Sequence, residues 1–393
     1  MEYWRQSLLD DGNSTRTIPL DLLVEILALL PPKSLIRFQS VSKLWHSTIR
    51  SKIIVDLFLT RSKTRPRLLL SLGGYGTKEC FIFSAPEHDI NDDDKSSTVM
   101  ARYEMPTLEP GYYLNSGSVN GFVCSKGVLP WIKVYNPITV YNPTTRQIVK
   151  LPDVTPNGRK MYARLGYDPV EDQYKVLCVM RVQAKRKNNQ QEHLVCTVSS
   201  SQEQEWRKIE NTTGDHYHSV YGETCIDGAL YYGVGKSRIV KFNVRSEKIE
   251  FIKTPKESKT HHSTLINYKG KLGGLDYSCT ENFMTLWVLE DEEKQEWSSM
   301  RFTLSSTWLD LFGWDCLRST GVIHTGELVV FNPLLESSKQ FYVCYYDFNK
   351  KSIRKVEIRG MVDGDFRRIH GIGELFGMEM LCFPGHIENI RFL

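Results

Sequence analysis

The side chains that most often perform chemistry in proteins are scattered along this chain of 393 residues. Its nine cysteines stand singly and form no CxxC pair, which favours buried free thiols over a disulfide framework. His216 and His218 lie two residues apart, and His261 and His262 are adjacent, but no Glu or third His lies nearby at metal-ligand spacing. The chain has no Walker loop, no G-x-S-x-G elbow and no H-E-x-x-H motif. We therefore expect no catalytic residue, no metal and no cofactor.

Four large aromatic side chains are candidates for binding a partner rather than for catalysis. Trp308, Phe312 and Trp314 stand close together in the sequence, and Trp131 lies in another loop-like segment. Exposed aromatic residues often anchor a protein partner, so these four are candidate substrate-binding residues. The alternative is that they pack between the β-sheets that the surrounding sequence predicts.

The composition is that of an ordinary globular protein. The chain has 50 basic and 46 acidic residues, a net charge of +4, and 41% hydrophobic residues, which exclude a wholly disordered chain and argue against nucleic-acid binding. The apolar stretch Leu22–Leu30 is too short to span a membrane, and the N-terminus has no secretory signal. We expect a soluble chain in the nucleus, the cytoplasm or both. The basic patch Lys185-Arg186-Lys187 fits a nuclear-import signal or, alternatively, a solvated hairpin tip.

The pattern of apolar residues changes near residue 65. Residues 17–63 have apolar side chains at helical spacing, whereas residues 64–393 have short β-rich runs separated by Gly, Pro, Asn and Asp. Residues 1–16 are expected to form a flexible N-terminus. The sequence therefore predicts a mainly β protein with a small helical domain at its N-terminal end.

The first expected helix is apolar on almost all sides. Pro19 suits its first turn, and Pro31-Pro32 ends it. Because a surface helix normally has a single apolar stripe, this helix should be buried on two sides. One face is formed by Leu20, Leu23, Ile26, Leu27 and Leu30, which fall at steps of three and four residues, and it is widened by Leu22 and Leu29.

Further short helices are expected at Lys33–Ser40, from an N-cap at Ser42 through Ile49, and at Ile53–Phe58. Fewer than about fifty residues in such helices bury too little apolar surface to be stable alone. The helical unit therefore needs a partner, and its first helix has apolar surface to offer one.

A family resemblance covers this whole helical region. Its residues are Ile18-Pro19-Leu20-Asp21-Leu22-Leu23-Val24-Glu25-Ile26-Leu27, Leu30-Pro31, Lys33-Ser34-Leu35, Arg37-Phe38 and Val41-Ser42-Lys43-Leu44-Trp45. This run resembles the F-box in its plant form. The resemblance implies docking on a Skp-type adaptor, which links to a cullin, a RING protein and a ubiquitin-conjugating enzyme.

Large apolar side chains usually supply most of the affinity when helices dock on a partner. The expected adaptor contacts are Pro19, Leu20, Leu23, Ile26, Leu27, Leu30 and Pro31. Leu35, Val41 and Trp45 are expected either to contribute to this contact or to pack internally. The alternative is that all of these residues form the core of an autonomous helical subdomain.

The C-terminal region shows weak internal repeats. Tight turns that contain glycine, such as Asn120-Gly121 and Asp227-Gly228, precede apolar strands, and such units start about every 40 to 60 residues. This spacing predicts a kelch-like β-propeller of six blades. The segment Ile369–Phe383 is expected to pair with a strand at Arg67–Leu72 and close the ring. An irregular β-sandwich is the alternative.

Several short motifs occur in this region: Asn142-Pro143-Thr144-Thr145 with Leu151-Pro152, Gly166-Tyr167-Asp168-Pro169, Glu205-Trp206-Arg207, Leu265-Ile266-Asn267-Tyr268-Lys269-Gly270-Lys271-Leu272, Trp287-Val288-Leu289-Glu290-Asp291, Glu296-Trp297-Ser298 and Phe341–Asp347. Together they resemble the plant F-box-associated domain. In that family the C-terminal domain is taken to select the protein to be ubiquitinated.

These observations suggest a non-catalytic subunit that recognises the substrate of an SCF-type ubiquitin ligase. Such a subunit needs no nucleophile, because another subunit holds the ubiquitin thioester. Two alternatives stay open. One is a propeller enzyme, a glycosidase or a metal oxidase, whose site would converge only in the folded chain. The other is a scaffold that binds the adaptor without promoting ubiquitination.

Overall fold

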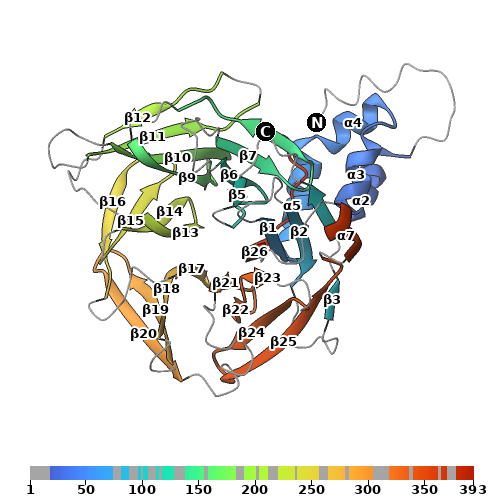
Figure 1. Cartoon of the computed structure of the whole chain (residues 1–393). Helices are drawn as coiled ribbons and strands as arrows, with labels where there is room; N and C mark the ends of the chain where they lie inside the picture. The colour runs from blue at the N-terminus through green and yellow to red at the C-terminus, as the bar shows by residue number, and fades with distance from the viewer. Residues whose placement is uncertain are drawn as a thin grey trace.

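The computed structural model of the chain shows a small unit of helices attached to one side of a ring of six β-sheets (Figure 1). We call the sheets blades and number them in the order in which the chain enters them. The structure describes residues 18–73, 81–87, 96–98, 101–104, 112–114, 117–127, 138–154, 158–182, 190–200, 203–210, 220–234, 237–255, 264–278, 283–303, 318–335, 340–361, 364–369 and 378–393.

Four helices form the N-terminal unit, and two of them begin at serine caps. The helices are α2 (Leu20–Leu29), α3 (Pro32–Phe38), α4 (Lys43–Ile49) and α5 (Lys52–Lys63). The Ser42 hydroxyl accepts the N–H of Trp45 at 3.1 Å, which confirms the expected N-cap of α4. Ser51 caps α5 in the same way, and α5 is therefore longer than the Ile53–Phe58 segment that the apolar pattern predicted.

The core of the helical unit lies between α2 and the later helices. Leu23, Leu27, Leu35, Ile49, Ile54, Val55 and Phe58 are buried together, and Ile390 from the far end of the chain joins them. At the C-terminal end of α2, the Arg61 side chain donates to the carbonyl of Ala28 at 2.9 Å and satisfies one of the unpaired helix-end carbonyls.

The first two blades lie nearest the helices. The first blade has the strand order β23 (Leu334–Leu335), β26 (Met378–His386), β1 (Arg67–Gly73), β2 (Phe81–Pro86) and β4 (Ala101–Glu104). The second blade has the order β5 (Tyr112–Leu114), β6 (Val123–Gly127), β7 (Ile138–Asn142) and β8 (Gln147–Lys150).

The third, fourth and fifth blades each have four antiparallel strands. The third is β9 (Gly158–Asp168), β10 (Gln173–Val182), β11 (Gln190–Thr197) and β12 (Arg207–Ile209). The fourth is β13 (Val220–Ile226), β14 (Ala229–Val234), β15 (Arg238–Asn243) and β16 (Ile249–Lys253). The fifth is β17 (Thr264–Tyr268), β18 (Lys271–Ser278), β19 (Phe283–Asp291) and β20 (Glu296–Thr303).

The sixth blade ends in a parallel edge strand supplied by the first blade's connection. Its order is β21 (Arg318–Val322), β22 (Leu328–Phe331), β24 (Tyr342–Asp347), β25 (Ser352–Arg359) and β3 (Ser96–Thr98). A short helix, α7 (Gly364–Ile369), packs its Phe366 ring edge-on against Phe81 of the first blade at 4.8 Å between ring centroids.

The last strand closes the ring, as the sequence predicted. β26 pairs antiparallel with β1, placing Cys382 opposite Leu70 and His386 opposite Arg67. The pairing strand begins later than expected, at Met378, because Ile369 ends helix α7 instead. The pairing of β3 with β25, which the sequence did not predict, is a second link between the first and sixth blades.

Strands in the middle of each blade are buried on both faces. In β10, Val176 and Cys178 pack toward the second blade, whereas Leu177 and Val179 pack toward the fourth. One such buried apolar cluster lies between each pair of neighbouring blades around the ring. The six-bladed propeller is therefore confirmed, and the β-sandwich alternative is wrong.

The cysteines that the structure describes are free thiols. Cys124, Cys178, Cys196, Cys344 and Cys382 are buried in strands, as expected, and burial raises the pKa of Cys196 to about 11. Within the described ranges, no three His, Cys, Asp or Glu side chains gather as a metal-binding group. His216, His218, His261 and His262 lie outside those ranges. No helix in the described part of the chain is long and apolar enough to cross a membrane.

Acid should weaken the propeller through His386. This side chain is fully buried, and its ring nitrogen Nδ1 lies 2.8 Å from the Ser118 hydroxyl. Burial, reinforced by the charge of Arg67, lowers the pKa of His386 to about 3. Between pH 6.5 and pH 3 the unfolded chain binds a proton that the folded chain does not, so this contribution to stability is present above pH 6.5 and is lost as the pH falls.

We predict that the pH dependence of unfolding is reduced in His386→Gln. Between pH 7.5 and 5.5 the His386 contribution should fall by about 1.4 kcal/mol, measured by urea unfolding. His46→Gln, the same substitution at an exposed position of α4, is the matched control. An unchanged pH dependence in His386→Gln would contradict the assignment.

Leu27 and Leu22 of α2 are a matched pair for testing the helical core. Leu27 is fully buried and Leu22 is 51% exposed. Leu27→Ala should destabilise the helical unit by about 2–5 kcal/mol through the cavity it leaves, whereas Leu22→Ala should change stability by about 0.5 kcal/mol or less. Amide hydrogen exchange of α2 and α5 measures the difference locally. Equal protection in both variants would refute the core described above.

Candidate functional site

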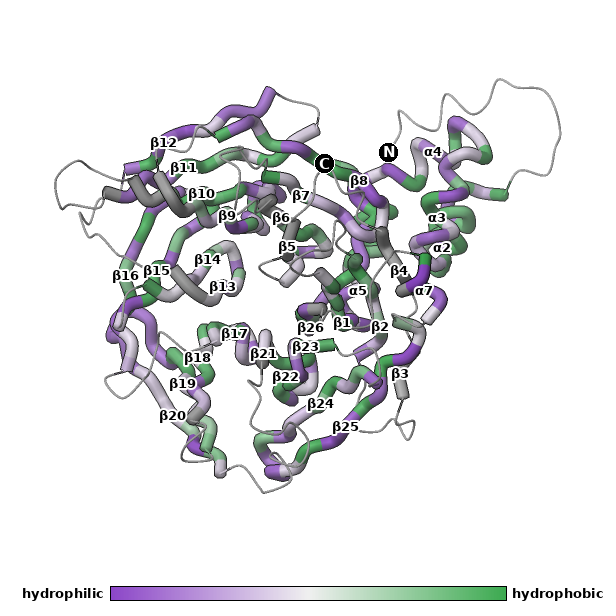
Figure 2. Tube along the Cα trace, viewed as in Figure 1, coloured by the Kyte–Doolittle hydropathy of each residue, from purple (hydrophilic) through white to green (hydrophobic). Residues whose placement is uncertain are grey.

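Helix α2 has one face toward its own core and another toward solvent. Leu22, Ile26 and Leu29 follow one another at steps of four and three residues, so they lie on one face of the helix. Their exposed fractions are 51%, 44% and 66%. We call these three residues the outer face of α2. Figure 2 shows the hydrophobic colour of α2 and α3 where the helical unit stands off from the propeller.

Three residues expected as partner contacts lie inside the unit. Leu23 and Leu27, four residues apart, are buried, and Leu35 of α3 is buried with them. Their side chains fill the core between α2 and α5, and Leu30 packs partly against the same core. This packing fixes α2 on the rest of the unit, so that its outer face points to solvent.

The remaining expected contacts lie nearer the surface. Pro19, Leu20, Pro31 and Val41 are exposed. Trp45 is half-buried, and its ring packs edge-on against Phe38 at 5.4 Å between ring centroids. Trp45 thus combines internal packing with some accessible surface, the two roles that the sequence left open.

Four exposed apolar residues of this region were not among the expected contacts: Ile18, Leu22, Leu29 and Leu44. Leu22 and Leu29 had been recognised only as residues that widen the apolar face of the first helix. Their exposure shows where on α2 the surplus apolar surface lies. The sequence pattern alone did not predict this position. Helix α5 adds Ile53 and Leu57, both exposed and one turn apart.

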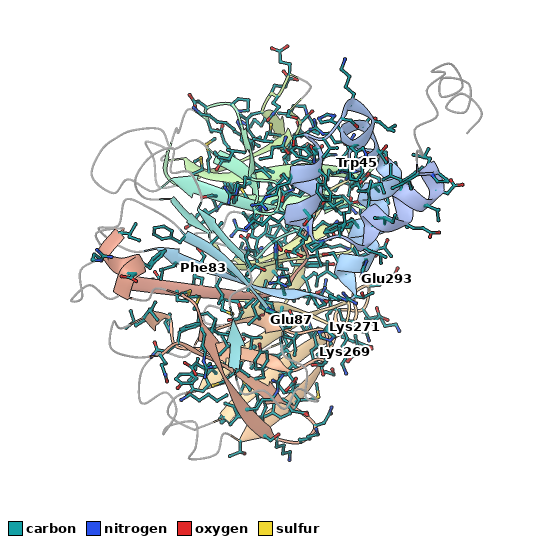
Figure 3. The ribbon with its side chains drawn as sticks, turned by 90° about the vertical axis from the view of Figure 1, so that its right-hand side faces the viewer. Trp45, Phe83, Glu87, Lys269, Lys271 and Glu293 are labelled. Carbon is teal, nitrogen blue, oxygen red and sulfur yellow. The ribbon has the colours of Figure 1, made fainter. Side chains whose placement is uncertain are left out.

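The propeller presents its own candidate site, a cavity of about 690 Å³ along the ring axis. Strands β9, β13, β17, β21 and β26 contribute to its wall, and Lys63 and Pro66 line it from the end of α5. Lys269, His324 and Asp227 are all in the lining, so its charge is mixed. In the side view of Figure 3, Lys269 and Trp45 lie toward the same side of the molecule.

The Glu87 side chain is buried beside this cavity, next to His324 of the lining. One carboxylate oxygen accepts the N–H of Gly385 at 2.6 Å, and the other lies 2.9 Å from the ring nitrogen Nδ1 of His324. Burial raises the pKa of Glu87, and these hydrogen bonds oppose the shift. Because each carboxylate oxygen has a hydrogen-bond partner, Glu87 links β26 to the β21–β22 turn.

The four aromatic candidates for substrate binding, Trp131, Trp308, Phe312 and Trp314, lie outside the described residues. Their role as substrate contacts stays a prediction. Among the described features, the outer face of α2 is the one whose residues share a single chemical character, and that character is suited to packing against another helix.

Comparisons with known proteins agree with this division of the chain. Residues 17–56 match the F-box domain, and residues 67–386 match the F-box associated beta propeller domain. The F-box protein At1g30790 of Arabidopsis thaliana is 38% identical over 407 residues, covering 96% of this chain and 98% of the relative. The F-box protein DOR of the same plant is 34% identical over 406 residues, covering 99% and 97%.

Solved structures with a related outline are more distant. Apo AztD from Citrobacter koseri matches 81% of this chain and 99% of its own, with 11% identity and a TM-score of 0.36. A putative 6-phosphogluconolactonase from Bacteroides uniformis matches 74% and 81%, with 11% identity and a TM-score of 0.38. These scores are too low to bear on the function of this chain.

The helical unit with its apolar outer face and the closed six-bladed ring thus coincide with two matched domains, and relatives align over almost the whole length. The chain belongs to the plant F-box proteins that have a C-terminal F-box-associated β-propeller domain.

Proposed function

We propose that this protein is the substrate-recognition subunit of an SCF-type ubiquitin ligase. The helical unit binds a Skp-type adaptor, through which it joins a cullin, a RING protein and a ubiquitin-conjugating enzyme. The propeller binds the protein to be ubiquitinated. Membership of the F-box family favours this role over the glycosidase or metal-oxidase alternative.

The exposure of the outer face of α2 is the observation on which this proposal rests. Leu22, Ile26 and Leu29 remain accessible although the unit has a filled core of its own. Full burial of an exposed Leu or Ile side chain contributes about 1.5–3 kcal/mol. Because these three are already about half buried, a partner that covers them recovers roughly half of that for each. An adaptor surface with an apolar groove meets this requirement.

The proposed role requires position rather than chemistry. In such an assembly the ubiquitin thioester is held by another subunit, and the target lysine is the nucleophile. Holding target and thioester in one complex raises their effective concentration, which by itself accelerates transfer. The interactions that matter in this chain are therefore those that bind the adaptor, bind the target and hold the two sites together.

Replacing two outer-face residues by charges should weaken adaptor binding. In Leu22→Asp with Ile26→Asp, the carboxylates would be buried against an apolar partner, so the Kd for a purified Skp-type adaptor should rise by at least about tenfold. Calorimetry or a pull-down measures the change. Ile369→Asp, at a 72% exposed position of α7 on the propeller, is the matched control. Wild-type affinity in the double variant would refute the proposed interface.

Reconstituted ubiquitination separates a degradative receptor from a scaffold. A partner recovered by affinity purification after proteasome inhibition should be ubiquitinated when adaptor, cullin, RING protein and conjugating enzyme are supplied. The reaction should be lost with the outer-face double variant, because the complex no longer forms. Tight binding of both adaptor and partner without transfer would favour the scaffold.

A further inference from the structure

The last seven residues of the chain, 387–393, lie beyond both matched domains. We call this segment the tail. It leaves the end of β26 and reaches the junction between the helical unit and the propeller, where the C-terminus is marked in Figure 1. Its contacts extend to both parts of the molecule.

Toward the helices, the tail completes the core. Ile390 is 1% exposed and packs in the cluster that contains Ile49 and Ile54. Every other described member of this cluster comes from the N-terminal helical unit. Beside it, the Arg50 guanidinium lies 4.0 Å above the centre of the Phe392 ring, a cation–π contact with the end of α4.

Toward the propeller, the tail is hydrogen-bonded to the second blade. Asn389 donates from its side chain to the carbonyl of Asn120 at 2.7 Å, and its backbone N–H donates to the Thr144 hydroxyl at 3.2 Å. The Asn142 side chain donates to the carbonyls of Asn389 and Arg391, each at 2.9 Å. Gln147 exchanges two further bonds with the backbone of residue 393.

A charged group on the third blade joins all three parts. The carboxylate of Asp172, in the β9–β10 turn, accepts hydrogen bonds from both terminal guanidinium nitrogens of Arg391, with 2.6 Å between Nη1 and Oδ1. The Lys52 Nζ of α5 lies 3.4 Å from Oδ2 of the same carboxylate. The Tyr167 hydroxyl donates to the same carboxylate at 2.7 Å. The hydrogen bonds from Arg391 hold the pKa of Asp172 well below its usual range.

We propose that the tail is a clasp that fixes the orientation of the helical unit on the propeller, with Ile390 and Arg391 as its positioning residues. This inference rests on the proposed function. If the helical unit is held by the adaptor, its orientation determines where the propeller presents lysines to the ubiquitin thioester. Among the described contacts outside the clasp, the short link between α5 and β1 and the Lys52–Asp172 pair also join the two parts.

Two glycines allow the clasp to be disturbed with a matched control. Gly121 and Gly270 both have a positive φ, +87° and +83°, so alanine causes similar backbone strain at each. A Cβ on Gly121 would lie 2.6 Å from both the Asn389 Cβ and the Ile387 carbonyl oxygen, whereas a Cβ on Gly270 meets nothing within 4 Å. Only Gly121→Ala should therefore displace the tail.

A second pair of variants tests the ion pair between Arg391 and Asp172. Arg391→Ala removes the pair with Asp172, and Arg368→Ala removes an exposed pair with Asp365 inside α7. If Gly121→Ala fails to fold, Arg391→Ala still tests the clasp. Full-length chains bound to the adaptor are compared by amide hydrogen exchange of α4 and α5, which should be at least about tenfold faster in the clasp variants than in their controls.

Self-ubiquitination of the propeller's own lysines provides the functional readout. In the reconstituted ligase, the initial rate of ubiquitination at the preferred lysine should fall about tenfold in Arg391→Ala, because the propeller becomes free to reorient relative to the helical unit. Ubiquitination of other lysines should increase. Adaptor affinity should be unchanged. Exchange and lysine pattern equal to those of Arg368→Ala would overturn the clasp. Loss of adaptor binding or of all transfer in the wild type would instead overturn the proposed function.

Discussion

The antiparallel pairing of β26 with β1 is the contact on which the arrangement of the whole molecule depends. β1 begins four residues after the end of α5, and the register places His386, the last residue of β26, opposite Arg67, the first residue of β1. Whatever follows β26 therefore emerges beside the point where the helices attach. Ring closure pairs β1 near the start of the propeller with the last strand of the chain, and it also brings the end of the chain to the helical unit some 330 residues away in sequence.

Much of this fold was predictable because local rules determine it. Proline at both ends of α2, Ser42 before α4 and the glycine turns of the blades each have one structural meaning, and each was confirmed. The inward and outward faces of α2 were not determined in this way. A helix that is apolar on all sides has no strong phase, so spacing placed Leu23 and Ile26 on one face although one is buried and the other exposed.

The tail could not have been predicted from the sequence by such rules. Ile390 and Phe392 form no periodic pattern, and their partners Ile54 and Arg50 lie in the N-terminal unit. Asp172 looks like an ordinary turn residue, since its φ of 56° is one that Asp tolerates. Its role appears only when the folded ring brings Arg391 and Lys52 to the same carboxylate. Contacts of this kind depend on the closed topology rather than on local preference.

The tail also changes how the small size of the helical unit should be understood. Fewer than fifty residues were expected to need a partner polypeptide for a complete core, yet Ile390 supplies part of that core from within the chain. Folding and the proposed docking therefore use different surfaces: the inner face of α2 packs in the core of the unit, and the outer face stays exposed. A docking helix that is already folded avoids the ordering cost of about 2–5 kcal/mol that coupled folding imposes on binding. In the proposed interface, burial of Leu22, Ile26 and Leu29 would then offset the translational, rotational and side-chain entropy lost on association, without a further cost of folding the helix.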